Sequence, residues 1–260
     1  MFNESKGIEE MTNVYIVDGA RTAFTAFCGS FAAVDAVQLG TATAVEALKR
    51  SGVKPEQIDH VVYGGVIATG ANAAYLARHI GLYAGVPQEV PALTQNRLCG
   101  SGMQSVVTAA QQILLGEANA VLAGGAENMS QSPYSNFEQR FGGAKIGDLK
   151  FIDMLSATLT DQYTGNGMGM TAEKLAEQYS ISREEQDEFA LLSHARAVAA
   201  REAGKFKKEI VPVTVKTRKG EMVIETDEHI KDGGTMESLA KLRPAFKKDG
   251  TVTAANASGI

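Results

Sequence analysis

The sequence has little cysteine and no tryptophan: Cys28 and Cys99 are the two cysteines among 260 residues. Two cysteines cannot form the dense disulfide framework of a small secreted domain, and no C-x-x-C pair or histidine-rich run predicts a metal site. A reducing compartment is therefore expected, and we predict the cytoplasm. Residues 1–10 are polar and acidic, without the apolar run of a secretory signal. Residues 1–12 are interpreted as an extension.

Two further features are missing, a long apolar stretch and an excess of positive charge. No apolar run approaches the roughly 20 residues of a membrane-spanning helix, so no membrane partner is expected. The formal net charge is −5, which argues against nonspecific binding to nucleic acid. With 44% hydrophobic residues, the chain can bury a sizeable core in one large domain or two smaller ones.

Short apolar runs that predict strands alternate with longer runs of helical spacing over the first 125 residues. Such an alternation predicts an α/β fold with a mostly parallel sheet that helices cover on both faces. Ligands of these sheets collect beyond the carboxyl ends of the strands. The expected strands are residues 14–17, 60–63, 90–94 and 120–123, and the expected helices run from Asp35 to Gly52, over residues 73–83, and from Cys99 to Gly116.

The pattern changes near residue 131. Residues 131–170 are rich in Gly, Asn, Ser, Gln and Met and predict a long irregular excursion. Ser182 and Glu185 have the spacing of a capping box, and the helix that follows is expected to turn Phe189 and Leu192 inward. Short strands are expected over residues 210–215 and 222–224. Residues 131–250 are interpreted as an α+β insertion that covers the sheet domain.

Cys99 is the candidate catalytic residue. It stands where the predicted strand of residues 90–94 ends and a helix begins. The free N–H groups of a helix N-terminus carry partial positive charge and favour a thiolate over a thiol. Gly100 and Gly102 leave the sulfur accessible. Taken alone, this pattern leaves open that Cys99 is a small hydrophobic residue packed under a turn.

The run Asn-Arg-Leu-Cys-Gly-Ser-Gly-Met-Gln at residues 96–104 resembles the nucleophile motif of the thiolase family, enzymes that make or cleave 3-ketoacyl-CoA thioesters. Five more segments resemble signatures of that family in the same order: residues 14–22, 124–130, 168–173, 242–246 and 253–259. The resemblance implies a layered α/β fold with a mostly parallel five-stranded sheet. It also implies a core domain of residues 13–130 and 251–260 and a CoA-binding loop domain of residues 131–250.

The resemblance implies chemistry at Cys99 and a set of residues that hold coenzyme A. Cys99 would attack a thioester carbonyl and become acylated, with coenzyme A as a substrate and with no cofactor or metal. The substrate-binding residues that the resemblance implies are Ser258, Met168, Phe246, Lys231, Ser238 and Ala254. Many short-chain members have histidine at the position of Gly167, so the length of the acyl chain stays open.

The resemblance implies that the family's second half has no counterpart in this sequence, which ends at Ile260. That half would supply a histidine, a second cysteine and an asparagine. The four histidines of this chain fall in none of the expected motifs, and Cys28 lies outside the context of the family's acid–base cysteine. We therefore expect little or no product from acetyl-CoA with this chain alone. The expected partners are acyl-CoA, CoA, copies of this chain in a dimer or tetramer, and a polypeptide carrying the C-terminal half.

Three alternatives remain. A decarboxylating ketoacyl synthase shares the fold and the cysteine at a helix N-terminus, but it lacks an insertion of this length. A half-protein that binds acyl-CoA without turnover, or the remnant of an interrupted gene, is the non-catalytic alternative. The glycines of residues 165–169 resemble a dinucleotide-binding fingerprint, but no apolar strand precedes them and the third glycine follows too soon.

Overall fold

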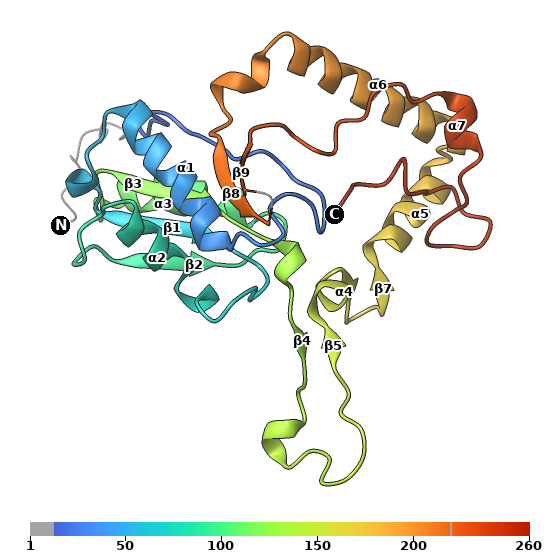
Figure 1. Cartoon of the computed structure of the whole chain (residues 1–260), viewed down its shortest axis with the longest axis horizontal. Helices are drawn as coiled ribbons and strands as arrows, with labels where there is room; N and C mark the ends of the chain where they lie inside the picture. Colours follow the sequence, from blue (N-terminus) through green and yellow to red (C-terminus); the bar gives the residue numbers. More distant parts are fainter. Residues whose placement is uncertain (1–12, 219) are drawn as a thin grey trace, which may run out of the picture. The chain divides into compact units, whose positions relative to one another are not determined.

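The computed structural model describes residues 13–218 and 220–260, and its contacts group these residues into two units (Figure 1). Unit 1 holds the described part of Met1–Gly19 together with Gly40–Val66 and Tyr75–Ala126. Unit 2 holds Ala20–Leu39, Ile67–Ala74 and Glu127–Ile260. The predicted extension, residues 1–12, lies outside the described residues. The predicted domain boundaries stay a prediction.

Unit 1 is built on a parallel sheet in the order β2-β1-β3. The strands are β1 His60–Gly64, β2 Ala92–Gln95 and β3 Val121–Gly125. Gly64 is level with Gln95 on one side and with Gly125 on the other, so the three carboxyl ends lie at one edge. The helices are α1 Ala36–Ser51, whose first turn belongs to unit 2, α2 Leu76–Tyr83 and α3 Ser101–Leu114. α2 packs on β1 and β2, and α3 packs on β1 and β3.

The expected α/β class is confirmed, but the expected number of strands is wrong for the part of the chain that the structure describes. The main sheet there has three strands instead of five. Residues 14–17 were predicted as a strand, yet they pair with no described strand, and the side chains of Tyr15 and Ile16 are 74% and 82% exposed. Apolar composition alone does not make a strand, because the backbone also needs a neighbouring strand to complete the hydrogen-bond ladder.

The buried face of α3 also differs from the sequence-based prediction. The apolar residues spaced along this helix suggested its inward face, but Met103 and Leu114 are exposed. The buried residues of α3 are Ser101, Ser105 and Ala109. Small side chains lie against the sheet because the helix approaches the strands closely, which leaves no room for larger ones.

Residues 131–170 of unit 2 are largely irregular, as predicted. Strands β4 Tyr134–Ser135 and β5 Ile152–Asp153 pair within this stretch and leave residues 136–151 as an extended arm (Figure 1). The remaining elements are α4 Met154–Thr158, β6 Thr160–Asp161, β7 Asn166–Gly167, α5 Met168–Tyr179, α6 Arg183–Glu202, β8 Val213–Thr217, β9 Gly220–Ile224 and α7 Met236–Ala240. The predicted strands near residues 210–215 and 222–224 are the antiparallel pair β8 and β9.

The capping box at the start of α6 is confirmed. The N–H of Glu185 donates to Ser182 Oγ at 3.1 Å, and the N–H of Ser182 donates to the Glu185 carboxylate at 2.7 Å. The predicted inward face of this helix is wrong, since Phe189 is 68% exposed and Leu192 is 45% exposed. Asp187 is the buried residue of α6. The helix α6 contacts α7 and the short helical turn Lys205–Lys208, which follows α6. The face of α6 that these contacts cover carries the polar residue Asp187 instead of Phe189 and Leu192.

An arginine joins the first segment of unit 2 to its last third. The Arg21 guanidinium donates to both carboxylate oxygens of Asp227, at 2.8 and 3.0 Å, and to Glu209 at 3.2 Å. The guanidinium also lies over the ring of Phe24 and over that of Phe206, at 5.1 and 5.4 Å from the ring centroids. Next to this cluster is an apolar core formed by Ala23, Phe31, Val34, Leu39, Val215 and Ile224.

Candidate active site

The turn that carries Cys99 follows the carboxyl end of β2 directly. Asn96 holds its first part, since its side chain accepts a hydrogen bond from Leu98 N–H at 2.8 Å and donates to the Val66 carbonyl at 3.1 Å. Ser101 holds its second part by accepting from Arg97 N–H at 2.8 Å and donating to the Leu98 carbonyl at 2.6 Å. The backbone thus fixes the position of the cysteine from both sides.

Leu98 shows that this turn is strained. Its φ of 48° lies in the left-handed region that side chains other than glycine rarely adopt. Such a conformation persists only where surrounding contacts enforce it, and strained residues of this kind cluster at functional sites. Asn96 and Ser101 supply those contacts. The arrangement reverses the chain within a few residues and leads it into α3.

Cys99 is exposed, and Ser101, two residues later, begins α3. Gly100 is the N-cap residue and has no side chain to occupy the first-turn N–H groups of the helix. Within the described residues the Cys99 thiol makes no hydrogen bond. An accessible sulfur beside the positive end of a helix has the environment of a nucleophilic cysteine. The alternative of a small hydrophobic residue packed under the turn is wrong, because Cys99 is exposed.

Two glycines at the ends of the sheet strands let the N-terminus of α3 approach the sheet closely. A Cβ on Gly64 would lie 2.4 Å from the carbonyl carbon of Ser101, and a Cβ on Gly125 would lie 3.1 Å from Gly102 Cα. Any side chain at these positions would displace the start of α3. Gly64 and Gly125 therefore set the height of the helix N-terminus over the strand ends.

The residues predicted to hold coenzyme A all lie in unit 2. Met168 begins α5 and is 57% exposed. The ring of Phe246 lies against the same helical turn, because a Cβ on Gly169 would be 2.3 Å from it. Phe246 is 47% exposed, so both predicted apolar contacts are accessible at the first turn of α5. Ala254 and Ser258 are both exposed in the segment that follows Thr253.

The other two predicted contacts are in different surroundings. Lys231 is exposed, and its backbone N–H donates to His194 Nδ1 at 3.3 Å. The Ser238 hydroxyl donates to the Thr235 carbonyl at 2.7 Å and takes part in the capping box of α7. A hydroxyl that donates within a cap has only its acceptor capacity left for a ligand. The ligand roles of all six residues stay predictions.

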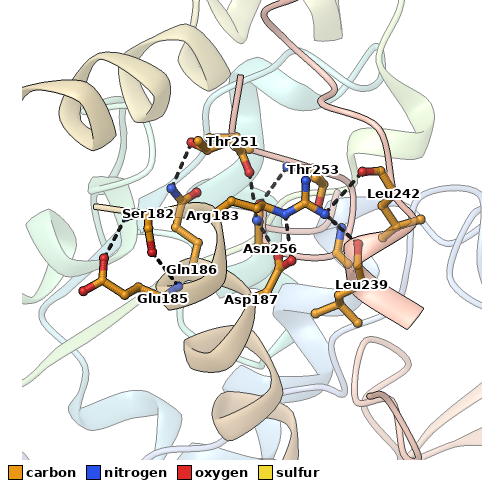
Figure 2. A network of polar contacts seen from close by, with 12 residues as sticks. Ser182, Arg183, Glu185, Gln186, Asp187, Leu239, Leu242, Thr251, Thr253 and Asn256 are labelled. Carbon is orange, nitrogen blue, oxygen red and sulfur yellow. Dashed lines mark hydrogen bonds and ion pairs between the residues drawn. The ribbon is translucent and has the colours of Figure 1, made fainter. Parts of the chain in front are cut away.

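A polar network missed by the sequence analysis joins three segments of unit 2 (Figure 2). Asp187 accepts from Arg183 Nε at 2.7 Å and from the Asn256 side chain at 2.8 Å. Arg183 also donates to the carbonyls of Leu239 and Leu242, at 2.6 and 3.2 Å. Arg183 and Asp187 have the i, i+4 spacing of an ion pair along a helix, but charged residues on a predicted helix are ordinarily assigned to its exposed face. The other partners lie 56 to 69 residues away, so no local signal indicated that this pair is buried against them.

Two other reactive residues, His79 and Cys28, have different surroundings. His79 stacks on Tyr75, with the ring centroids 5.3 Å apart. Cys28 is exposed in a turn with φ of 58°, and its N–H donates to Ser130 Oγ at 2.8 Å. Among the described residues no group of three or more His, Cys, Asp or Glu side chains could hold a metal ion. None of the described helices has both the length and the apolar character to cross a membrane.

A comparison with protein families gives one match that covers nearly the whole chain: the N-terminal domain of thiolases matches residues 14–260. The chain belongs to the thiolase family. The 3-ketoacyl-CoA thiolase of Rattus norvegicus mitochondria is 51% identical over 251 residues, which are 96% of this chain and 63% of the relative.

Solved thiolase structures agree with this assignment. The Bacillus anthracis acetyl-CoA acetyltransferase is 44% identical with a TM-score of 0.91, and the match covers 96% of this chain and 63% of that one. Human mitochondrial 3-ketoacyl-CoA thiolase in complex with CoA is 48% identical with a TM-score of 0.89, over 94% of this chain and 61% of that one. The chain thus spans somewhat less than two thirds of the length of these thiolases.

Proposed function

We propose that this chain is the part of a thiolase-type acyltransferase that carries the nucleophile. In the first half-reaction the Cys99 sulfur attacks the carbonyl carbon of an acyl-CoA. A new carbon–sulfur bond forms to Cys99, the bond to the CoA sulfur breaks, and the coenzyme leaves as a thiolate that takes up a proton. The thiol proton of Cys99 passes to a base, a role that the family resemblance gives to a histidine of the second half. Covalent catalysis of this kind divides one difficult acyl transfer into two easier steps.

The observation that carries this proposal is the setting of Cys99. The sulfur is exposed, follows a sheet strand directly, and stands beside the uncapped N-terminus of α3. That end of a helix also stabilises the oxyanion that develops on a thioester carbonyl under attack. Membership of the thiolase family supports acyl-CoA as the substrate, as does the CoA bound in the human relative.

The CoA-binding part of the proposal uses the exposed residues of unit 2. Met168 and Phe246, both exposed at the first turn of α5, would contact the pantetheine arm. Ser258 would hydrogen-bond an amide of that arm, with Ala254 nearby in sequence, and Lys231 would face the phosphates of the nucleotide. Ser238 is the weakest of the six because its hydroxyl is engaged in a helix cap.

A second candidate is an acyl-CoA-binding half-protein that does not turn over. The match covers 63% of the rat relative, and the resemblance assigns the acid–base residues to the family's second half. A partner polypeptide with the C-terminal half belongs to this candidate. Self-association into a dimer or tetramer and a cytoplasmic location are proposed for the chain under either candidate. Two unpaired, exposed cysteines support a reducing compartment.

The experiment is to incubate the purified chain with acetyl-CoA and locate the acetyl group by peptide mass spectrometry. We expect a thioester on Cys99 that hydroxylamine removes. Cys28→Ala is the matched control, because Cys28 is the other exposed cysteine and should not be needed. Cys99→Ala should abolish labelling. Equal labelling of both cysteines, or none on Cys99, would refute the proposed nucleophile.

Steady-state turnover separates the two candidates. Acetoacetyl-CoA formation by the 260-residue chain alone, lost in Cys99→Ala, would contradict the binding-only candidate. Turnover that appears only when a polypeptide with the second half is added, and that Cys99→Ala abolishes, would support the proposed nucleophile. Binding of acyl-CoA with neither acylation of Cys99 nor turnover would support the binding-only candidate.

A further inference from the structure

Two buried carboxylates in unit 2 have no role in the chemistry proposed above. Glu173 of α5 is 4% exposed and Asp187 of α6 is 2% exposed. Acidic side chains are rarely buried so completely unless hydrogen bonds or ion pairs replace the water they lose. Both carboxylates contact the segment of residues 251–256, which leads directly into the exposed Ser258.

Glu173 accepts hydrogen bonds from two consecutive backbone N–H groups. Thr251 N–H donates to it at 2.9 and 3.1 Å, and Val252 N–H donates at 2.9 Å. The Thr251 hydroxyl lies 3.2 Å from the same carboxylate. A Cβ on Gly250 would be 2.3 Å from Glu173 Oε1, so the glycine is what lets the backbone come this close.

Asp187 holds the next residues of the segment through Asn256. The Asn256 side-chain amide donates to Asp187 at 2.8 Å and to the Thr251 carbonyl at 3.1 Å (Figure 2). Its oxygen accepts from Thr253 N–H at 2.7 Å. Gln186, next to Asp187 on α6, donates to the Thr251 hydroxyl at 2.9 Å. The segment is thus fixed from α5 and from α6 at once.

The hydrogen bonds of Glu173 and Asp187 determine the positions of Ala254 and Ser258, two residues predicted to contact the pantetheine arm. Ala254 lies inside the fixed segment, and Ser258 follows Ala257, whose N–H donates to the Thr253 carbonyl at 3.0 Å. Glu173 lies on the same helix as Met168. The carboxylate therefore ties the helix that presents Met168 to the segment that presents Ala254 and Ser258.

We propose that Glu173 is a positioning residue of the acyl-CoA site, whose carboxylate fixes residues 251 and 252 and thereby aligns Ser258 and Ala254 with Met168 along the pantetheine arm. Asp187 supports the same segment from α6. This inference rests on the proposed function, and it assigns Glu173 no contact with the ligand. It predicts that losing the carboxylate affects the arm of coenzyme A and spares the nucleotide, which the proposal gives to Lys231.

The experiment compares two ligands and two glutamines on one helix. Coenzyme A and adenosine 3′,5′-bisphosphate, the nucleotide part without the arm, are titrated into the purified 260-residue chain by calorimetry. Glu173→Gln keeps the size and shape of the side chain, but it replaces one accepting oxygen with an NH₂ group that faces the donors Thr251 N–H and Val252 N–H. Its matched control is Glu177→Gln, whose side chain is 75% exposed and pairs with Lys247 at 3.4 Å.

Glu173→Gln should weaken coenzyme A binding about tenfold, the equivalent of one charge-assisted hydrogen bond, and leave nucleotide binding unchanged. Glu177→Gln should change neither. Equal weakening of both ligands would show a purely structural role and overturn the inference, as would unchanged CoA binding in a folded Glu173→Gln protein. If Glu173→Gln does not fold, Thr251→Val decides, since it removes a hydroxyl from the same contact and should weaken CoA binding alone. Failure of the unaltered chain to bind coenzyme A would refute the proposed function itself and the inference with it.

Discussion

Replacing Arg21 by lysine should loosen the first segment of unit 2. Arg21 donates to both oxygens of Asp227, and its side chain is 22% exposed while that of Asp227 is 9% exposed. Burial raises the pKa of Asp227, but the hydrogen bonds from Arg21 and Phe24 together lower it by more, so that the net shift of the pKa is downward. Lysine keeps the positive charge, but it cannot form the bidentate hydrogen bonds to Asp227 or stack on the rings of Phe24 and Phe206 as a planar guanidinium does.

Arg21→Lys should lower the free energy of local opening around Phe24 by about 2 kcal/mol, which is within the range for one hydrogen bond to a charged group in a mostly buried site. Hydrogen exchange at Phe24 measures it directly, because Phe24 N–H donates to Asp227 at 2.8 Å. A loss of about 2 kcal/mol corresponds to roughly 30-fold faster exchange where local opening limits the rate. Lys241→Met serves as the control, since its pair with Glu237 is exposed and should contribute less than about 1 kcal/mol.

The reasoning fails if Arg21→Lys changes Phe24 exchange by less than about threefold, or if Lys241→Met changes it as much. Amides of β1, which belongs to unit 1, should exchange as in the unaltered chain. Faster exchange there as well would mean that the substitution destabilises the whole protein instead of this segment.

Three further outcomes are expected. Gly64→Ala should displace the start of α3, because its Cβ would meet Ser101; we expect a loss of about 1–3 kcal/mol in thermal unfolding and slower alkylation of Cys99 by iodoacetamide. Ser182→Ala should cost about 1 kcal/mol through the lost cap of α6, measurable by urea unfolding, and an unchanged midpoint would contradict the cap's role. Burial raises the pKa of Glu173, but the backbone donors Thr251 and Val252 hold it below its ordinary value of 4.5; the free energy of unfolding should therefore be fully retained above pH 4.5 and fall below it, more steeply than in Glu173→Gln.

The setting of Cys99 could be predicted because its signals are local. A short apolar run, a turn and a helical repeat lie within 30 residues, and the structure contains β2, the turn and α3 in that order. The strained φ of Leu98 and the bonds of Ser101 carry no such signal, since they depend on how one particular turn closes.

The buried face of α3 could not be predicted because it depends on contacts far apart in the sequence. Gly64 and Gly125 come together at the strand ends through the register of β1 and β3, and only then do they select small residues on the helix. Glu173 and Asp187 follow the same logic. Their partners lie about 70 to 80 residues further along the chain, where no periodicity connects them.

The arm of residues 136–151 has a practical consequence for handling this protein. Its outer part is exposed and holds Arg140, Lys145 and Lys150, so a trace of trypsin should cleave there first. Cleavage would divide unit 2 between two fragments, one with Arg21 and the other with Asp227, whose ion pair and surrounding packing would keep the pieces associated. The arm is thus a position at which the chain could be divided into two co-expressed fragments, or at which a purification tag could be inserted.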